Sequence, residues 1–588
     1  MEKLLILFEK INLEKKKEVI FFNDIIQKNF LASNKNNIDD KNKKIFEPYG
    51  LSKQLLYEDA KYLDKVFDKQ INKVSDALNN LHKKNNSTKY WNIILGIWLR
   101  DLIYTAYNRF KTLKNGLKKF DVNEIILIKD KKNNFPIIES TTFNSYTNNM
   151  LFDAILVSNI FENLENKTGI KIVDSQEFYL PLINNIRNKK SNKLHLLNFL
   201  SKTLNFFNNS DESKYFILRS YLNLFDEIRL NFLLNKKIQL NEYPFIEYKE
   251  KKISNSLRLK LNFYNNSENE FENILGKIMP YYMPMTVIEN YNQVEDFIKK
   301  KINWPKNPEL IFTSNSFGEG GAAQFWIAEK VEKGSKYFIG QHGAGYLELY
   351  DKKFRVENKP SDGLVTWGKK IFDNKLYPLF NYSVLKKKKH KSLGKNLIIV
   401  FRSSGVRTAP YDRFEYGKII YDNSIKIIQN LSEQIKKETI LRLHSNYTKG
   451  IYFTFDNFLE KNKYLKIDRK TNYYKILKNS KLIIFNDYSS GFLQNLSLNY
   501  PSIVYLPLGL SFIHDENKAD FEELIKENLI FTDIKKLNNH LNEIWDNIDV
   551  WWNSKSIVKT RETFLEKYSL KPSLNSLSKF SNTLKKFN

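Results

Sequence analysis

The feature that most constrains the fold is an alternation of short apolar runs with helical patterns, which occurs twice in the second half of the chain. Apolar runs at Leu310–Thr313, Lys336–Gly340 and Leu364–Trp367 are separated by a glycine-rich turn and a helical pattern. The alternation restarts at Leu397 and continues to Leu506. Strands that alternate with helices pair in parallel, so each series predicts a doubly wound, Rossmann-like sheet.

Two such sheets that face each other leave a cleft at the carboxyl ends of their strands, where ligands bind in open α/β folds. From Lys53 to about Leu113, apolar residues recur at helical spacing with a break at Asn85–Thr88, which predicts a large helical elaboration in the N-terminal half. The domains that we expect are an N-terminal α/β domain at 1–375, a linker at 376–395, a C-terminal Rossmann-like domain at 396–545, and helices at 546–588 that cross back to the first domain.

The composition restricts the class of protein. The chain has no cysteine, which excludes disulfides, thiolate metal sites and cysteine nucleophiles. The longest strongly apolar stretch, Tyr90–Leu99, is too short to span a bilayer. We therefore expect a soluble, cytoplasmic protein. A net charge of +28 favours an anionic partner. The alternative is that the excess charge reflects composition alone, because lysine is abundant throughout the chain.

The first candidate site segment is the loop Thr313–Gly321, with the sequence TSNSFGEGG, between an expected strand and an expected helix. Backbone N–H groups in such a loop can bind an anion, and Ser316 lies within it. The alternative is a simple strand-to-helix turn with a Ser or Asn cap. Glu319 is a candidate general base, because its carboxylate would face the cleft from a glycine loop.

The second candidate segment is Gly340–Tyr346, with the sequence GQHGAGY, directly after an expected strand. Histidine is rare here, with 7 in 588 residues, and His342 lies between glycines in a loop. This placement favours a functional histidine over one buried in a core. An imidazole there would bind a diphosphate or sugar, or accept the proton of an acceptor hydroxyl. Gln341 and Gly343 belong to the same loop on the acceptor side.

The third candidate segment is spread over three strand ends of the second sheet. These ends have the sequences FRSSGVR from Phe401, LRLHSN from Leu441 and NDYSSG from Asn486. Guanidinium groups, an imidazole and hydroxyls at a helix N-terminus suit the phosphate of a nucleotide. The donor-binding residues that we expect are Arg402, Arg407, Arg442, His444, Ser489 and Ser490.

Other chemistries have no matching motif. The sequence lacks H-E-x-x-H, an EF-hand loop and a D-x-D motif, so we expect neither a metal nor a cofactor. A Ser–His–Asp hydrolase would need a G-x-S-x-G elbow, which does not occur. No recognised nucleic-acid motif occurs either, so we expect no nucleic-acid partner.

Four stretches, Tyr57–Phe110, Thr313–Gly368, Asn486–Leu506 and His540–Ser569, resemble a family of transferases encoded in bacterial surface-polysaccharide and lipopolysaccharide gene clusters. The resemblance implies a metal-independent GT-B glycosyltransferase with a donor-binding C-terminal domain and an acceptor-binding N-terminal domain. The implied transfer uses a nucleotide-sugar donor and a glycan or lipid-linked acceptor. The excess of basic residues, rather than the resemblance, leads us to expect peripheral contact with the anionic inner face of the cell membrane.

The donor is less well defined. Arg442–His444 and the pair Ser489–Ser490 are similar to the histidine and serine motifs of sialyltransferases that use CMP-sugars, which favours a CMP-linked 2-keto sugar acid such as a nonulosonate or Kdo. Ser445 stands where those enzymes usually have proline. One alternative is a polyol-phosphate or other surface-polymer transferase of the same fold. Another is a non-catalytic basic protein that binds nucleic acid or polysaccharide.

Overall fold

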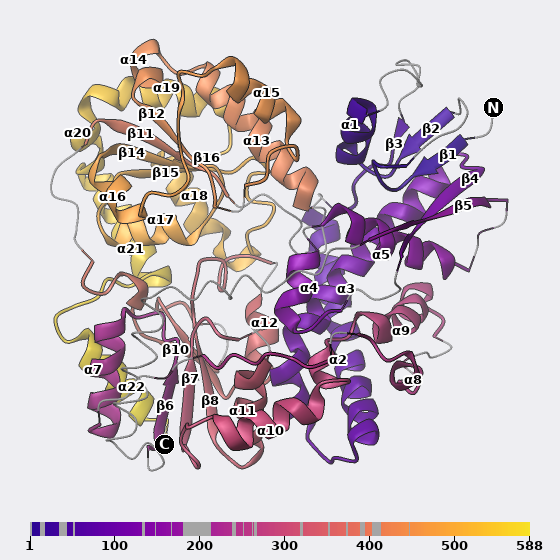
Figure 1. Cartoon of the computed structure of the whole chain (residues 1–588). Coiled ribbons are helices and arrows are strands. Elements are labelled where there is room, and N and C mark those ends of the chain that lie inside the picture. Colours follow the sequence, from indigo (N-terminus) through magenta and orange to yellow (C-terminus); the bar gives the residue numbers. More distant parts are fainter. Residues whose placement is uncertain are drawn as a thin grey trace.

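The computed structural model contains three α/β units, each built around one sheet (Figure 1). The described residues are 3–11, 18–33, 44–50, 53–131, 136–147, 149–165, 167, 169–179, 213–237, 241, 243–250, 252–261, 263, 267–317, 321–350, 353–371, 374–387, 394–402, 413–445 and 447–587. The strands in each sheet pair in parallel, as expected of strands connected through helices.

The first sheet lies at the N-terminal end of the chain, with the strand order β3-β2-β1-β4-β5. Its strands are β1 Lys3–Ile6, β2 Glu18–Phe21, β3 Lys44–Ile45, β4 Glu124–Asp130 and β5 Lys171–Phe178. The apolar run Glu124–Ile128 predicts one of these strands, but the sequence does not indicate a separate sheet. The region 1–375 therefore contains two sheets rather than one sheet with helical insertions only.

The helix α3 (Thr88–Lys119) is the central element of the N-terminal half. It packs against α2 (Lys53–His82), against α5 (Met150–Glu162) beside the first sheet, and against α11 (Gly321–Glu332) beside the second. Because it is covered on all sides, its residues from 90 to 110 are all buried. The apolar stretch Tyr90–Leu99 is thus part of a core helix. No helix within the described ranges is both long enough and apolar enough to cross a membrane.

The second sheet has the strand order β10-β9-β8-β7-β6. Its strands are β6 Tyr215–Leu218, β7 Leu310–Thr313, β8 Lys336–Gly340, β9 Gly363–Thr366 and β10 Leu376–Pro378. The strands β7 and β8 have the predicted bounds, and β10 lies in the segment expected to begin the linker. The helices of this part of the chain are α7 Leu224–Asn235, α8 Asn255–Arg258, α9 Glu270–Tyr282, α10 Tyr291–Lys301, α11 and α12 Lys353–Asn358.

The third sheet has the order β13-β12-β11-β14-β15-β16 and lies above the second in Figure 1. Its strands are β11 Asn396–Val400, β12 Thr439–Arg442, β13 Lys466–Asp468, β14 Ser480–Phe485, β15 Ser502–Tyr505 and β16 Ile530–Phe531. Its helices are α13 Arg413–Gln429, α14 Glu433–Lys437, α15 Phe453–Lys461, α16 Tyr473–Lys478, α17 Ser490–Ser497, α18 Lys518–Lys526, α19 Ile534–Ile544 and α20 Ile548–Trp552. This is the doubly wound arrangement that the strand–helix alternation predicts.

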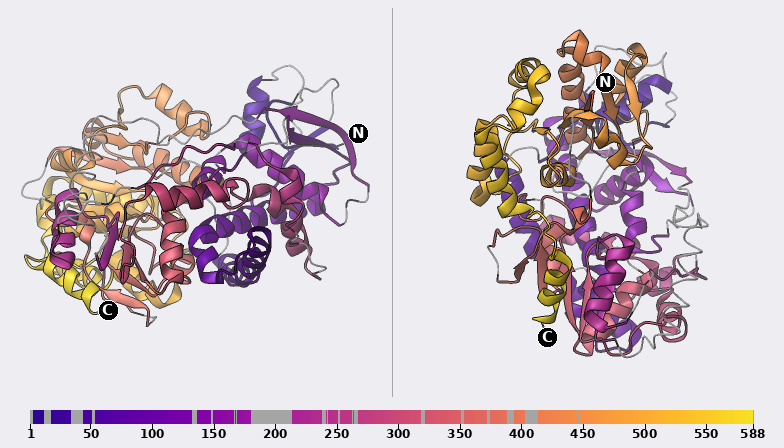
Figure 2. Two further views of the ribbon diagram at one scale, coloured as in Figure 1. Left: turned by 60° about the horizontal axis from the view of Figure 1, so that its bottom comes forward. Right: turned by 90° about the vertical axis from the view of Figure 1, so that its left-hand side faces the viewer.

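The last two helices, α21 (Lys555–Tyr568) and α22 (Ser576–Lys585), run from the third sheet to the second (Figure 2). The Leu570 amide donates to the Trp367 carbonyl at 2.8 Å. The Phe580 ring lies edge-on to Phe312 of β7, with ring centroids 5.3 Å apart. The C-terminal segment therefore packs on the second sheet and ties the two sheets together.

Candidate functional site

A pocket lies between the second and third sheets, at the carboxyl ends of their strands. It is reached by the loops after β8, β11, β14 and β15, and its volume is about 350 Å³. In open α/β folds this edge is the usual position of a ligand. The residues that line it are His342, Gly343, Ala344, Gly345, Tyr346, Leu349, Arg402, Tyr416, Asp487, Tyr488, Ser489, Ser490, Leu506, Gly509, Phe512 and Ile513.

The loop after β8 forms one wall of this pocket and carries His342. The His342 Nδ1 atom lies 3.0 Å from the Ser314 carbonyl oxygen and 2.5 Å from the Tyr346 hydroxyl. A carbonyl only accepts hydrogen bonds, so Nδ1 carries the proton when it bonds to Ser314. That tautomer leaves the lone pair on Nε2, which is the form of the ring that a general base needs.

The Tyr346 hydroxyl lies against the ring edge between the two nitrogens, 2.5 Å from Nδ1 and 3.1 Å from Nε2. Burial, together with the carboxylate of Glu357, raises the pKa of Tyr346 well above its usual value. The tyrosine therefore stays protonated at any physiological pH. The uncharged Tyr346 hydroxyl therefore holds the His342 ring in position through a hydrogen bond.

The N-terminus of α17 forms the opposite wall of the pocket. Ser490 Oγ accepts a hydrogen bond from the Ala344 amide at 2.9 Å, which connects the loop after β8 to the third sheet. Ser489 is the N-cap residue, and in the described structure its side chain does not cap the helix. The first N–H groups of a helix and the adjacent hydroxyls favour an anion, so this wall is suited to a phosphate.

A charged pair completes the pocket at the ends of β11 and β14. Arg402 Nη1 donates to Asp487 Oδ2 at 2.6 Å, and the guanidinium lies over the ring of Tyr416, 4.9 Å from its centroid. The Tyr416 hydroxyl donates to the other Asp487 oxygen at 2.8 Å. Asp487 and Tyr416 thus fix the direction in which Arg402 points. Arg402 is the one Lys or Arg among the described residues that line the pocket.

The loop after β8 is also tied to the loop after β15. The buried Glu348 carboxylate accepts from the Tyr488 hydroxyl at 2.7 Å and from the Gly345 amide at 3.0 Å. Its backbone carbonyl accepts from the His514 amide at 2.8 Å. Burial, and then the Glu348 carboxylate, raise the pKa of Tyr488 well above its ordinary value. The two sheets are therefore joined by buried polar bonds directly beside the pocket.

Ser316 and Gln341, which we predicted on the acceptor side, bond to other residues of the fold. Ser316 is buried, and its hydroxyl bonds to the hydroxyl of Thr313. Gln341 is also buried: its Oε1 accepts from the Trp367 amide at 2.8 Å, and its Nε2 donates to the Gly343 carbonyl at 2.9 Å. Gln341 shapes the loop after β8 that carries His342, whereas Ser316 lies in the loop after β7, and neither side chain lines the pocket.

The predicted donor-binding residues are only partly brought together. Arg402, Ser489 and Ser490 line the pocket with His342 and Gly343, whereas Arg442 and His444 are not among its lining residues. The Arg442 guanidinium forms an ion pair with Asp468 of β13. Glu319 and Arg407 lie outside the described residues.

Sequence reasoning did not identify Asp487, Tyr416 or Glu348. Asp487 directly follows a strand end beside the two serines, so its position was a usable signal for a partner of Arg402. Tyr416 lies on α13, away from any strand end, and only the folded structure brings it to the pocket. In the part of the chain that the structure describes, no group of three or more His, Asp or Glu side chains is placed to hold a metal ion.

Comparison with known proteins identifies a family. The model of a family described as LIC12162 family transferase matches residues 7–583. A comparison with curated protein sequences gave no significant match.

Several solved structures show distant similarity. The structure of TarM has a TM-score of 0.29 and 12% identity, over 47% of this chain and 54% of that one. The structure of WaaG, a glycosyltransferase involved in lipopolysaccharide biosynthesis, has a TM-score of 0.30 and 11% identity, over 63% and 99%. MurG of Acinetobacter baumannii has a TM-score of 0.30 and 12% identity, over 50% and 77%. The chain thus spans about half the length of TarM, and similarity at this level identifies no activity.

Proposed function

The chain belongs to the LIC12162 family of transferases, and from this we propose that it is a glycosyltransferase that moves a sugar from a nucleotide-activated donor to a surface-glycan or lipid-linked acceptor. The observation that carries the proposal is the pocket between two parallel sheets. One wall presents an imidazole, and the opposite wall presents a helix N-terminus, two hydroxyls and a guanidinium. These are the groups that a transfer from a phosphate leaving group requires.

The donor phosphate is proposed to bind at the N-terminus of α17. Ser489 and Ser490 would donate to its oxygens, and Arg402 would offset its charge from the end of β11. Asp487 and Tyr416 support this role because they hold the guanidinium at the pocket wall. We propose that these groups stabilise the leaving nucleotide in place of a metal ion.

We propose a nucleoside monophosphate as the leaving group. Arg402 is the one cationic side chain in the described lining, and Asp487 already neutralises part of its charge. CMP carries fewer charges than a nucleoside diphosphate and would need less compensation. The leaving group that we propose is CMP, from a CMP-linked 2-keto sugar acid as the donor.

His342 is proposed as the general base. Nε2 would take the proton of the acceptor hydroxyl as that oxygen bonds to the anomeric carbon. The bond between the anomeric carbon and the phosphate oxygen breaks at the same step, and CMP leaves with both electrons of that bond. Ser314 and Tyr346 orient the ring for this transfer.

A transfer assay with mass detection tests the proposal. The purified protein is incubated with CMP-, UDP-, GDP- and CDP-linked donors and with extracted surface glycans or lipid-linked acceptors. We expect the acceptor to gain the mass of a sugar acid only with a CMP donor, and His342→Ala to lower kcat by about 10²–10⁴-fold. A His342→Ala variant with full turnover would reject the site, and gain of a polyol phosphate from a CDP donor would support the alternative transferase.

A further inference from the structure

An exposed surface formed by α7 and α22 has the chemistry of a membrane-binding face. The two helices lie side by side on the flank of the second sheet, near the C-terminus in Figures 1 and 2. Lys585 of α22 connects them, since its Nζ donates to the Leu233 carbonyl of α7 at 2.9 Å. We call this surface the α7–α22 face.

The helix α7 exposes its aromatic side chains and buries its acidic ones. Phe225 is 76% exposed and Phe232 is 49% exposed, although large apolar side chains are normally covered. Asp226 and Glu227 are both buried. Asp226 is paired with Lys386 and, at 3.7 Å, with the exposed Arg229, and the Glu227 carboxylate accepts from the Ser220 amide at 2.9 Å. The two carboxylates of α7 are therefore buried with bonding partners, whereas its two phenyl rings are exposed to solvent.

Three exposed residues of α7 form one stripe. Phe225, Arg229 and Phe232 are spaced by four and three residues, so they lie on the same face of the helix, and the exposed C-cap residue Lys236 follows its end. Aromatic and cationic side chains alternate along this stripe. Aromatic side chains with cationic neighbours are the groups that bind the interface of an anionic bilayer.

The helix α22 extends the positive charge of this surface. It contains no acidic residue, and with the residue that follows it exposes Lys579, Lys585 and Lys586. In α7 and α22, all of whose residues the structure describes, no carboxylate is exposed. A protein partner matched to this surface would need acidic and apolar groups side by side. An anionic membrane supplies negative headgroups and apolar chains along its whole surface.

We propose that the α7–α22 face is a docking surface for anionic phospholipid membranes. Phe225 and Phe232 insert at the level of the lipid headgroups, and the surrounding Arg and Lys side chains contact lipid phosphates. The N-terminus of α7 lies near the carboxyl edge of β6, and because the sheet is parallel this is the edge that also carries His342. The inference goes beyond the proposed function and does not depend on it, because lipid binding needs neither donor nor transfer.

Vesicle co-sedimentation of the full chain tests this proposal without any measurement of transfer. The vesicles contain phosphatidylcholine and phosphatidylglycerol in equal parts, or phosphatidylcholine alone. The test variant is Phe225→Ser/Phe232→Ser. The matched control is Tyr464→Ser/Val550→Ser, which removes two exposed apolar side chains from the third α/β unit. Circular dichroism and the Tm of each variant show that it is folded.

We expect the wild-type protein to pellet with the anionic vesicles, with binding that weakens as salt increases. The test variant should lose about tenfold or more of its affinity, and the control should bind as the wild type does. Four outcomes overturn the proposal: a wild type that does not pellet, equal binding to phosphatidylcholine alone, a test variant that binds normally, and a lipid-free dimer that Phe225→Ser/Phe232→Ser dissociates. The last outcome would make the surface an interface between two copies of the chain.

Discussion

Ser490 Oγ accepts a hydrogen bond from the Ala344 amide at 2.9 Å, and this bond joins the second and third sheets across the pocket. The neighbouring Gly343 leaves the space that the bond needs. A Cβ atom at position 343 would lie 2.8 Å from Ser490 Oγ, which is closer than such atoms normally approach. The position of α17 relative to the histidine loop thus depends on a hydroxyl and on the lack of a side chain opposite it.

Ser490→Ala should therefore weaken both stability and donor binding. Loss of this partly buried hydrogen bond lowers the free energy of unfolding by about 1 kcal/mol. Because the same hydroxyl is proposed to bind the phosphate, the KM for the donor should also rise. Urea denaturation and steady-state kinetics measure the two effects. In Ser489→Ala, whose side chain makes no capping bond, we expect only the KM to change; equal loss of stability in both variants would contradict this account.

Two arginines of the third sheet provide a matched comparison. Arg402 pairs with Asp487 inside the pocket, and Arg442 pairs with Asp468 outside its lining. Arg402→Ala should weaken CMP binding about 10- to 100-fold, as expected for loss of a charge-assisted hydrogen bond. Arg442→Ala should leave the affinity for CMP nearly unchanged. Isothermal titration calorimetry measures both affinities, and the reverse order would place the nucleotide at the end of β12.

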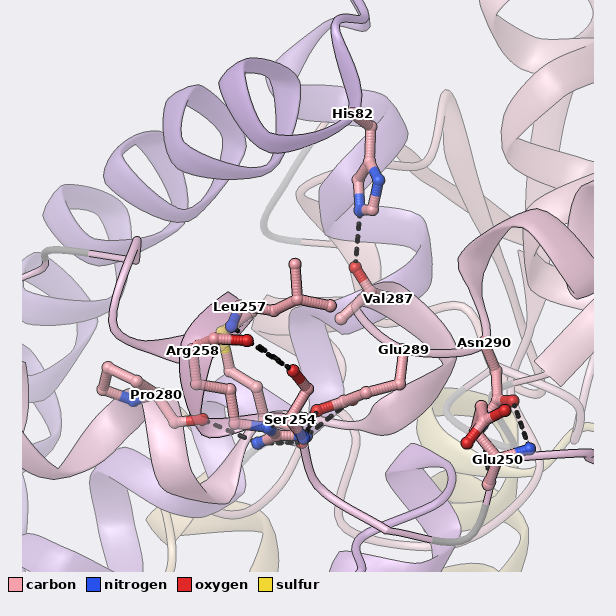
Figure 3. Close-up of polar contacts among 11 residues, drawn as sticks. His82, Glu250, Ser254, Leu257, Arg258, Pro280, Val287, Glu289 and Asn290 are labelled. Carbon is pink, nitrogen blue, oxygen red and sulfur yellow. Dashed lines mark hydrogen bonds and ion pairs between the residues drawn. The ribbon is translucent and has the colours of Figure 1, made fainter.

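The buried pair of Arg258 and Glu289 should be a stability determinant of the N-terminal half (Figure 3). Arg258 Nε and Nη2 donate to the two Glu289 oxygens at 2.8 and 3.0 Å, and Nη1 donates to the Pro280 carbonyl at 2.7 Å. Both side chains are almost completely buried. Glu289→Ala would leave a buried guanidinium without its counter-charge, which costs about 3–5 kcal/mol.

Thermal or urea unfolding of Glu289→Ala checks this value. The double variant Arg258→Met/Glu289→Leu serves as a control, because it removes both charges and should recover much of the lost stability. If the double variant is less stable than Glu289→Ala, the penalty does not arise from an unpaired charge.

Acidification below pH 6.5 should destabilise the protein through two histidines. Burial lowers the pKa of His82 and of His540 below the usual value of 6.5. The unfolded chain takes up these protons near pH 6.5 and the folded chain only at lower pH. Stability from both groups is thus present above pH 6.5 and is lost as the pH falls through the folded pKa values.

The free energy of unfolding, measured by urea denaturation between pH 8 and pH 5, checks this sign. His82 Nε2 donates to the Val287 carbonyl at 2.8 Å (Figure 3), and its ring stacks on Tyr291 at 3.8 Å between centroids. His82→Gln removes the titrating ring and should flatten the pH dependence. Stability that increases toward pH 5 would show that these histidines gain rather than lose protons on folding.

The sequence predicts β7, β8, β9 and most strands of the third sheet, because these are short, continuous apolar runs between clear turn signals. The edge strands β6 and β10 of the second sheet are not predicted. The strand pairing of the first sheet cannot be predicted from the sequence, for a physical reason. Its central pair joins Leu4 of β1 with Glu124 of β4, and two long helices lie between them in the chain. Local patterns give no information on which distant strands pair. The edge strand β5 is also largely exposed and polar, so it has little apolar pattern.

The candidate site likewise contains residues whose position the sequence predicts and residues whose position it does not. His342, Arg402 and Ser490 follow strand ends, and parallel pairing brings strand ends to one edge of a sheet. Arg442 and His444 also follow a strand end, but β12 lies one strand beyond β11 in the order of the sheet. Strand order is a property of the tertiary fold, so the sequence could not show that these two residues lie outside the pocket lining.

A crystal structure of the protein with bound CMP tests the central claim most directly. The account predicts the CMP phosphate at the N-terminus of α17, within hydrogen-bonding distance of Ser489 and Ser490 and beside Arg402, with His342 across the pocket. CMP bound instead at Arg442 and His444, or anywhere outside the space between the second and third sheets, would contradict it.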